Sequence, residues 1–295
     1  MEVDNRMRII ATADLHYDIG RSRQPALDIA DEICRQQADA LLILGDVAGR
    51  DPGILRDCLH LFDRFNGRKF FVAGNHDIWT EPGGDSLDRL ECELPAICRQ
   101  TGFHPLDIEP ALADDIGLVG SIGWYDFSYR PAELGIPIRF YEEKIAPGAA
   151  ARLAGFEHLL ADRSDIPVPA FDIGTRWMDG EHIHLPMSDL EFCRHLLKRF
   201  DEHLMWLSDR CGRIVVALHH IPFPELVPKS EKPGWAFANA FLGSGQFGQV
   251  IRRFPKIRYV LCGHSHAPDR QQIAHVECIN IGCTYREKRY EIIAM

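Results

Sequence analysis

The sequence has few basic residues relative to its acidic ones. It contains 33 Lys and Arg against 43 Asp and Glu, so its formal net charge is −10 over 295 residues. Proteins that bind a nucleic-acid backbone are more often basic, because neutralising phosphates supplies much of their affinity. The acidic balance therefore disfavours nucleic acid as a partner, although it leaves room for a local basic patch or for carboxylates that hold cations.

Long apolar runs are also missing. No segment approaches the roughly 20 apolar residues that a membrane-spanning helix needs. The longest strongly apolar runs, such as Ala40–Leu44 and Ile214–Leu218, suit buried strands instead. The N-terminal stretch MEVDNRMRIIATADLH holds no apolar run long enough for a signal peptide. We therefore expect no membrane partner and a cytoplasmic location.

The cysteines follow neither a disulfide nor a zinc-site pattern. The nine cysteines are scattered, odd in number, and include no C-x-x-C pair. Reduced thiols in a reducing compartment are the simplest explanation of this usage.

The first third of the chain alternates between two kinds of hydrophobic pattern. Short apolar runs of the buried-strand type alternate with segments that have helical spacing. The expected strands are Arg8–Ala13, Ala40–Leu44 and Phe70–Ala73, and the expected helices are Pro25–Gln37, with Pro25 in its first turn, and Ile54–Phe65. Such alternation predicts a parallel sheet with helices on its faces.

Further elements are expected in the rest of the chain. A helix is expected over Ser86–Arg99, and a capping-box pattern at Ser188 predicts a long helix that ends near Ser208. The remaining predicted elements are strands at Ile116–Ser121, Ile214–Leu218 and Arg258–Cys262, a helix at Gln246–Phe254, and strands at Val276–Ile281 and Arg289–Ile293 that complete a second half. The segment from about 125 to 186 is rich in proline, glycine and aromatic residues, which indicates an irregular insertion or cap.

Polar residues with related chemistry follow five of the expected strands. These blocks are Asp14 with His16, Gly45 with Asp46, Gly74–Asp77, His219 with His220, and Gly263–His266. In open α/β sheets, ligands bind beyond the carboxyl ends of the strands. The five blocks are therefore expected to converge on one site.

The side chains in these blocks suit a metal site. Carboxylate, imidazole and amide groups are ligands for Mn, Fe, Zn or Ni. In the pairs Asp14 and His16, and His264 and His266, the two-residue spacing points both side chains to the same side of an extended backbone. Asp46 brings a carboxylate whose two oxygens could bridge two metals about 4 Å apart. The glycines before the polar residues allow sharp turns and close approach of the backbone.

The other histidines have a simpler explanation. A lone histidine is usually a surface residue or a satisfied core residue, and this applies to His60, His104, His158, His195, His203 and His275. His182 and His184, within the irregular segment, are weak candidates for ligands by the same reasoning.

The combined motif D-x-H, G-D, G-N-H-D, H, G-H-x-H resembles that of the calcineurin-like metallophosphoesterases, and it spans Asp14 to His266. The resemblance implies an α/β fold, a four-layer α/β-β/α sandwich of two mixed sheets flanked by helices, with two metals at the strand ends. One metallophosphoesterase domain over residues 1–295 is then expected, with a cap-like insertion at about 125–186.

Residue roles follow from the same resemblance. It implies that Asp14, His16, Asp46 and His266 hold the first metal, and that Asp46, Asn75, His219 and His264 hold the second. His76 is expected to contact the phosphate and to protonate the leaving group, and Asp77 is expected to orient His76 by a hydrogen bond. His219 is assigned as the ligand within the His219–His220 pair, and His220 could instead line the pocket.

The implied activity is hydrolysis of a phosphate mono- or diester by a hydroxide that bridges two divalent or mixed-valence metal ions. Two dications lower the pKa of a shared water toward neutrality and offset charge on the phosphate oxygens. A nuclease, a protein phosphatase and a non-catalytic scaffold are the alternatives, and the intact ligand set argues against the scaffold.

One segment gives an indication of the substrate. The sequence GWYDFSYRPAELGIPIRFYEEK places the aromatic residues Trp124 and Tyr125 near Arg130 and Arg139. Aromatic rings can stack on a base and arginine can bind phosphate, which would suit a small, nucleotide-like phosphoester. The alternative is that the rings form a small core and the arginines are solvated, and this alternative is favoured.

Overall fold

The computed structural model describes residues 6–295, and its first sheet has five strands. The strand order is β11-β1-β2-β3-β4, in which β1 to β4 are parallel and β11 is antiparallel to β1. The strands are β1 (Arg8–Thr12), β2 (Ala40–Leu44), β3 (Arg68–Val72), β4 (Phe103–Pro105) and β11 (Glu291–Ala294).

The second sheet has six strands in the order β5-β6-β7-β8-β10-β9. The edge strands β5 and β9 are antiparallel to their neighbours, and the four inner strands are parallel. The strands are β5 (Ala111–Ala113), β6 (Ile116–Ser121), β7 (Arg213–Leu218), β8 (Ile257–Cys262), β9 (Asp269–Ile273) and β10 (Val276–Asn280). Both sheets are therefore mixed, as predicted.

The alternation of side chains along each strand builds two cores. In β7, Val215 and Ala217 belong to the core between the two sheets, whereas Val216 belongs to the core under the helices. In β2, Leu42 and Ile43 divide in the same way. Because successive side chains point to opposite faces of a strand, a continuous apolar run is needed when both faces are covered.

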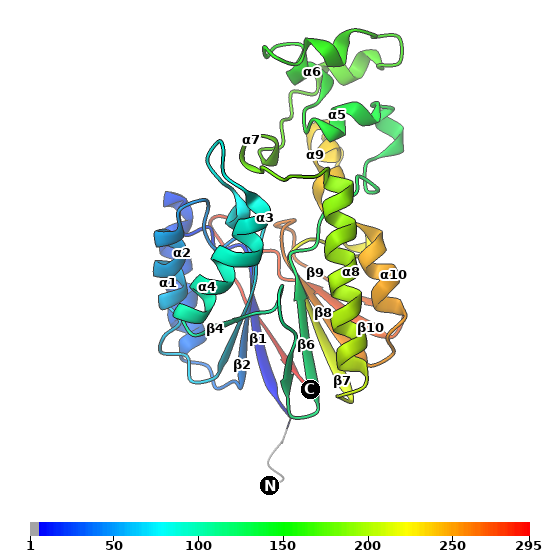
Figure 1. Ribbon diagram of the computed structural model, residues 1–295. Helices are drawn as coiled ribbons and strands as arrows, with labels where there is room; N and C mark the ends of the chain where they lie inside the picture. Colours follow the sequence, from blue (N-terminus) through cyan, green and yellow to red (C-terminus); the bar gives the residue numbers. More distant parts are fainter. Residues whose placement is uncertain (1–5) are drawn as a thin grey trace.

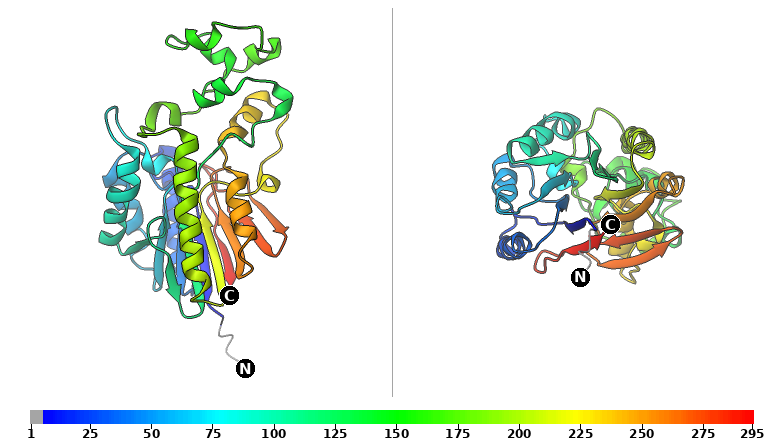
Figure 2. Two further views of the ribbon diagram at one scale, coloured as in Figure 1. Left: turned by 45° about the vertical axis from the view of Figure 1, so that its right-hand side comes forward. Right: turned by 90° about the horizontal axis from the view of Figure 1, so that it is seen from below.

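Helices cover the outer face of each sheet (Figure 1). The first sheet is covered by α1 (Gly20–Cys34), α2 (Pro52–His60) and α4 (Leu94–Gln100), and the second by α8 (Asp189–Ser208) and α10 (Gly245–Arg252). The view along the strands in Figure 2 shows the helices outside both sheets. The predicted four-layer α/β-β/α sandwich is confirmed.

The insertion rises above the carboxyl ends of the strands as a set of short helices and loops (Figures 1 and 2). Its helices are α5 (Ile138–Glu142), α6 (Pro147–Ala150) and α7 (Asp179–His182). Elsewhere the chain forms α3 (Ser86–Asp88), α9 (Pro233–Ala238), a π-helical turn (Arg89–Glu93), and 3₁₀ turns at His76–Ile78, Ala132–Leu134, Glu157–Leu160, Val168–Asp172, Pro224–Leu226 and Asn239–Phe241. Among residues 6–295, no helix combines the length and the apolar character that crossing a membrane requires.

Some sequence-based boundaries were wrong. Helix α1 begins at Gly20, so Pro25 lies inside it and not in its first turn. In the first turn of α1, the Ser22 hydroxyl donates a hydrogen bond to the Leu15 carbonyl. This contact does not depend on apolar residues at helical spacing, so the hydrophobic pattern did not reveal the earlier start. The last strand, β11, pairs with β1 of the first sheet and does not extend the second. A short apolar strand carries no signal of which sheet edge it will join.

Other predictions hold with small changes. Helix α8 begins with the expected capping box, in which the Ser188 hydroxyl accepts from the Glu191 backbone and the Glu191 side chain accepts from the Ser188 backbone. The helix expected over Ser86–Arg99 is helical along its length but contains the π-helical turn.

Candidate metal centre

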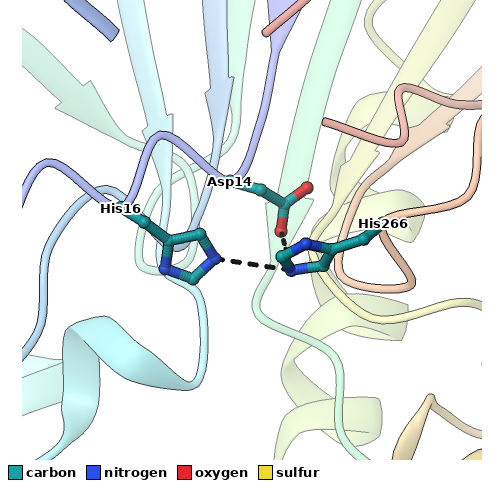
Figure 3. A group of neighbouring side chains, drawn as sticks. All are labelled: Asp14, His16 and His266. Carbon is teal, nitrogen blue, oxygen red and sulfur yellow. Dashed lines mark hydrogen bonds and ion pairs between the residues drawn. The ribbon is translucent and has the colours of Figure 1, made fainter. Parts of the chain in front are cut away.

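The predicted ligands meet at the carboxyl ends of the parallel strands, between the two sheets. Asp14 and His16 follow β1, Asp46 follows β2, and the residues from Asn75 follow β3. The second sheet contributes His219 and His220 after β7, and His264 and His266 after β8. Figure 3 shows Asp14 and His16 from the first sheet facing His266 from the second.

One group of donor atoms lies around His16. Its Nε2 atom is 3.4 Å from Nε2 of His266 and 3.6 Å from Oδ2 of Asp46. Nε2 of His266 is in turn 3.9 Å from Oδ1 of Asp14 (Figure 3). These four residues are the predicted ligands of the first metal.

A second group lies around His219. Its Nε2 atom is 3.1 Å from Oδ1 of Asn75, 3.1 Å from Nδ1 of His264, and 3.4 Å from Oδ1 of Asp46. These are the predicted ligands of the second metal. Asp46 presents Oδ2 to the first group and Oδ1 to the second, which is the arrangement that a bridging carboxylate requires.

Backbone carbonyls determine which ring nitrogens are free to bind a metal. Nδ1 of His219 lies 2.8 Å from the Leu44 carbonyl, and Nε2 of His264 lies 3.2 Å from the Phe241 carbonyl. A carbonyl only accepts, so each of these nitrogens carries the proton and donates it. The nitrogens that face each other therefore both present lone pairs, as metal ligands do.

The backbone is strained where it carries the ligands. Five of the predicted ligands have positive φ angles, which L residues rarely adopt: Asp14 (53°), His16 (44°), Asp46 (53°), His264 (70°) and His266 (55°). Each such residue costs about 1–3 kcal/mol and persists only when its surroundings enforce it. Strain that gathers on the predicted ligands marks this region as a functional site.

Two glycines let the ligand loops approach each other. Gly45 has a φ of 80°, and a Cβ atom there would lie 2.5 Å from the Gly74 nitrogen. A Cβ atom on Gly74 would lie 2.2 Å from both the nitrogen and Oδ1 of Asp46. Neither distance is compatible with a side chain, so both positions require glycine for close approach.

The electrostatics of the group favour bound cations. Burial raises the pKa of Asp14 to about 7, and burial followed by the charges of Asp14 and Asp77 raises the pKa of Asp46 well above its usual range. Burial also holds the pKa of His219 and His264 well below the usual range, so these imidazoles are neutral at neutral pH. Neutral imidazoles and buried, mutually repelling carboxylates form a donor set that fits two transition-metal ions.

His76 faces the same centre from a 3₁₀ turn (His76–Ile78). Its Nε2 atom is 3.9 Å from Oδ2 of Asp46, and its ring stacks on Trp79 with the centroids 3.8 Å apart. The side chain keeps 17% exposure, whereas that of His219 has none. His76 is therefore placed where a substrate could reach it beside the metal ligands.

The structure does not show the expected hydrogen bond in which the Asp77 carboxylate accepts from the His76 imidazole. The Asp77 carboxylate instead accepts from the backbone N–H groups of Val47 and Ala48 at 3.0 Å each and from that of Gly74 at 2.8 Å. Nδ1 of His76 has no hydrogen-bond partner among residues 6–295. With these three backbone donors, the Asp77 carboxylate links the loops after β2 and β3.

His220 lies outside both donor groups. Its Nδ1 atom lies 2.8 Å from the Ile122 carbonyl, and its ring packs against His264 with the centroids 4.2 Å apart. Its Nε2 atom is buried and lacks a hydrogen-bond partner within the described part of the chain. The geometry favours His219 as the ligand.

The four residues in and next to the insertion that were candidates for substrate contact make other contacts within the protein. Trp124 and Tyr125 are fully buried, and the Trp124 indole donates to Asp189. Arg130 donates to the Phe127 carbonyl at 3.0 Å. Arg139 forms a two-pronged ion pair with Asp165 at 2.6 and 2.8 Å. The buried rings agree with the favoured alternative of a small core, whereas the arginines are bonded to neighbouring protein groups and not simply solvated.

The two weak histidine candidates also lie outside the donor groups. The ring of His182 packs against Trp79, with the centroids 4.5 Å apart. Nδ1 of His184 lies 2.7 Å from the Thr80 hydroxyl.

Sequence reasoning missed two side chains beside the first metal group. The Tyr285 ring packs against His16 and His266, with centroid distances of 4.8 and 5.1 Å. The exposed guanidinium of Arg21 lies 4.3 Å from the centre of the Tyr285 ring. Neither residue belongs to a recognisable motif, so only their positions in the fold reveal them.

The fold brings groups of candidate metal ligands together at the junction of two sheets. The calcineurin-like phosphoesterase family model matches residues 7–268. The chain therefore belongs to the calcineurin-like phosphoesterase family, and the predicted resemblance is confirmed. Members of this family are hydrolases that act on phosphoester bonds and depend on two metals. No curated protein sequence gives a significant match.

Solved structures share the fold. Phosphopantetheinyl hydrolase from Mycobacterium tuberculosis superposes with a TM-score of 0.66 at 17% identity, covering 95% of this chain and 90% of that one. A dimetal phosphatase from Danio rerio gives a TM-score of 0.52 at 16% identity, covering 93% and 86%. At these identities the likeness concerns the fold.

Proposed function

We propose that this protein hydrolyses a phosphate mono- or diester with two divalent or mixed-valence metal ions of the Mn, Fe, Zn or Ni type. The observation that carries the proposal is the position of Asp46, whose two oxygens face two separate groups of ligands. Such a pair of ions, when bound, supplies an activated water and positive charge opposite the phosphate.

The residues divide the work by position. Asp14, His16, Asp46 and His266 would hold one ion, and Asn75, His219 and His264 would hold the other together with Asp46. His76 is the partly exposed imidazole beside this set, and burial followed by the nearby His266 lowers its pKa to about 3. It is therefore neutral, and its Nε2–H can donate to the phosphate or to the leaving oxygen.

Two side chains beside the site are candidates for contact with a small phosphoester substrate. Arg21 and Tyr285 lie at the edge of the first ligand group, with the Arg21 guanidinium over the Tyr285 ring, where the exposed guanidinium can contact a negatively charged part of the substrate beyond the phosphate. A nucleotide-like molecule carries such groups. This pair replaces Arg130 and Arg139 as the proposed contacts. The cytoplasmic location stays a prediction from the sequence.

The proposal is tested by removing and restoring the metal. Purified protein is treated with a chelator, and hydrolysis of an aryl phosphomonoester, an aryl phosphodiester and a cyclic nucleotide is measured before and after addition of Mn²⁺. Loss of hydrolysis on chelation and its return with Mn²⁺ is expected. Hydrolysis that persists without metal would contradict the proposal, and the ranking of the three substrates separates monoester from diester preference.

A further inference from the structure

One buried carboxylate of the insertion reaches the metal centre. Asp179 begins α7 and has 1% exposure. Its Oδ1 atom accepts from Nδ2 of Asn75 at 2.9 Å and from Nε1 of Trp79 at 2.8 Å. Its Oδ2 atom accepts from Nε1 of Trp177 at 2.8 Å and from the Tyr125 hydroxyl at 3.2 Å. Four donors converge on one carboxylate, and one of them belongs to a predicted metal ligand.

The contact with Asn75 determines which end of its amide faces the metal. An amide is nearly symmetric in shape, so rotation by half a turn would present NH₂ in place of oxygen to the ligand group. An ionised carboxylate only accepts, so Asp179 holds the NH₂ end. Oδ1 of Asn75 is thereby left 3.1 Å from Nε2 of His219, inside the second group.

The contact with Trp79 reaches the other functional side chain. The same oxygen of Asp179 that holds Asn75 also holds the Trp79 indole. The Trp79 ring stacks on His76 with the centroids 3.8 Å apart and the planes 23° apart. The Asp179 carboxylate thus contacts both Asn75, a predicted metal ligand, and Trp79, the ring against which His76 stacks.

We propose that Asp179 is a positioning residue through which the 125–186 segment orients Asn75 and His76. This inference rests on the proposed metal-dependent function. Outer hydrogen-bond partners of metal ligands typically change metal affinity by about 10- to 100-fold when they are replaced. The simpler rival is that Asp179 only anchors the insertion, because Tyr125 and Trp177 lie near the two ends of that segment.

The test is Mn²⁺ affinity, measured by calorimetric titration of the metal-free protein. In Asp179→Asn, an NH₂ group replaces one of the two accepting oxygens, and we expect Mn²⁺ affinity at the second site to fall about 10- to 100-fold. The matched control is Asp189→Asn, which also removes a carboxylate that accepts from a buried indole, here that of Trp124, and from Lys144. The control leaves Asn75 untouched, so its Mn²⁺ affinity should stay within about threefold of the parent.

A reciprocal exchange separates positioning from anchoring. Asn75→Asp alone places two carboxylates against each other and should also weaken Mn²⁺ binding. In the double variant Asn75→Asp with Asp179→Asn, donor and acceptor exchange places between these two positions, and we expect Mn²⁺ binding at least 10-fold tighter than in either single variant. The Trp79 indole loses its acceptor in this variant, so the recovery concerns metal binding and not the position of His76. If Asp179→Asn alone does not fold, the double variant is compared with Asn75→Asp only, and the same recovery is required.

The outcomes distinguish this inference from the function on which it rests. Equal Mn²⁺ affinity in Asp179→Asn and the parent, an equal loss in Asp189→Asn, or no recovery in the double variant would overturn the positioning role. Parent protein that binds no Mn²⁺ at all would instead overturn the metal-dependent function itself.

Discussion

Nε2 of His219 and Nδ1 of His264 lie 3.1 Å apart, and the carbonyl contact on the far side of each ring assigns a lone pair to both of these nitrogens. The proton of each ring is donated to a backbone carbonyl on its other side. Two lone pairs at this distance repel each other, and a shared cation removes the repulsion. The facing lone pairs of these two histidines therefore favour a bound cation in the folded protein.

Bound metal should stabilise the folded protein against unfolding, in addition to its role in hydrolysis. Because the ligands come from distant parts of the chain, the unfolded state has no comparable site, and Mn²⁺ at 100 times its dissociation constant should add about 2.7 kcal/mol to the free energy of unfolding. We expect the melting temperature of chelated protein to rise by several degrees when Mn²⁺ is added. Differential scanning calorimetry measures this, and Asp46→Ala, which lacks the bridging carboxylate, should show no comparable rise.

Asp46 and His76 should fail in different ways. Asp46→Ala should lose both metals and all activity, because both ligand groups share its carboxylate. His76→Ala should keep both metals and lose about 10²- to 10⁴-fold in turnover, because His76 acts on the substrate. Elemental analysis of the purified variants beside their kinetics makes the comparison. Loss of both metals in His76→Ala would show that the imidazole is a ligand after all.

Gly74→Ala should disrupt the centre. A methyl group at this position would lie 2.2 Å from the nitrogen and Oδ1 of Asp46, so the bridging carboxylate has to move. We expect loss of bound Mn²⁺ together with a lower melting temperature. Gly20→Ala serves as the control, because its methyl group meets nothing within 4 Å. The account of the glycines would fail if both variants bound metal as the parent does.

The two proposed arginine roles can be separated by kinetics. Arg21→Ala should raise KM for a nucleotide by about 10-fold, the cost of one charge-assisted contact, with less change for a simple aryl phosphate. Arg139→Ala should leave both KM values unchanged, because its guanidinium is held by Asp165. A higher KM in Arg139→Ala, with none in Arg21→Ala, would restore the sequence-based assignment.

The convergence of the predicted ligands could be foreseen from the sequence because each of them follows a buried parallel strand. Such strands align their carboxyl ends, so residues as far apart as Asp14 and His266 have to meet. The roles of side chains outside the motifs could not be predicted in this way. Arg139 looked available for a substrate because nothing in the local sequence reveals its pairing with Asp165.

The same limit applies to contacts that the insertion makes. Asp179 is an ordinary acidic residue in an irregular segment, and only folding places it against Asn75, 104 residues earlier in the chain.

For Asp77, the sequence motif predicted a contact that the structure does not contain. The motif suggested a hydrogen bond with the adjacent His76, but the Asp77 oxygens accept from backbone N–H groups that follow β2 and β3. Local sequence patterns predict where strands end. Which donors bind a given carboxylate depends on residues that only the folded structure brings near it.

The most direct test of the central claim is a crystal structure of the Mn²⁺-loaded protein, with the metals located by anomalous scattering. The account predicts two peaks, one among Asp14, His16 and His266 and one among Asn75, His219 and His264, with one oxygen of Asp46 on each. A single peak, or peaks that do not share Asp46, would contradict it.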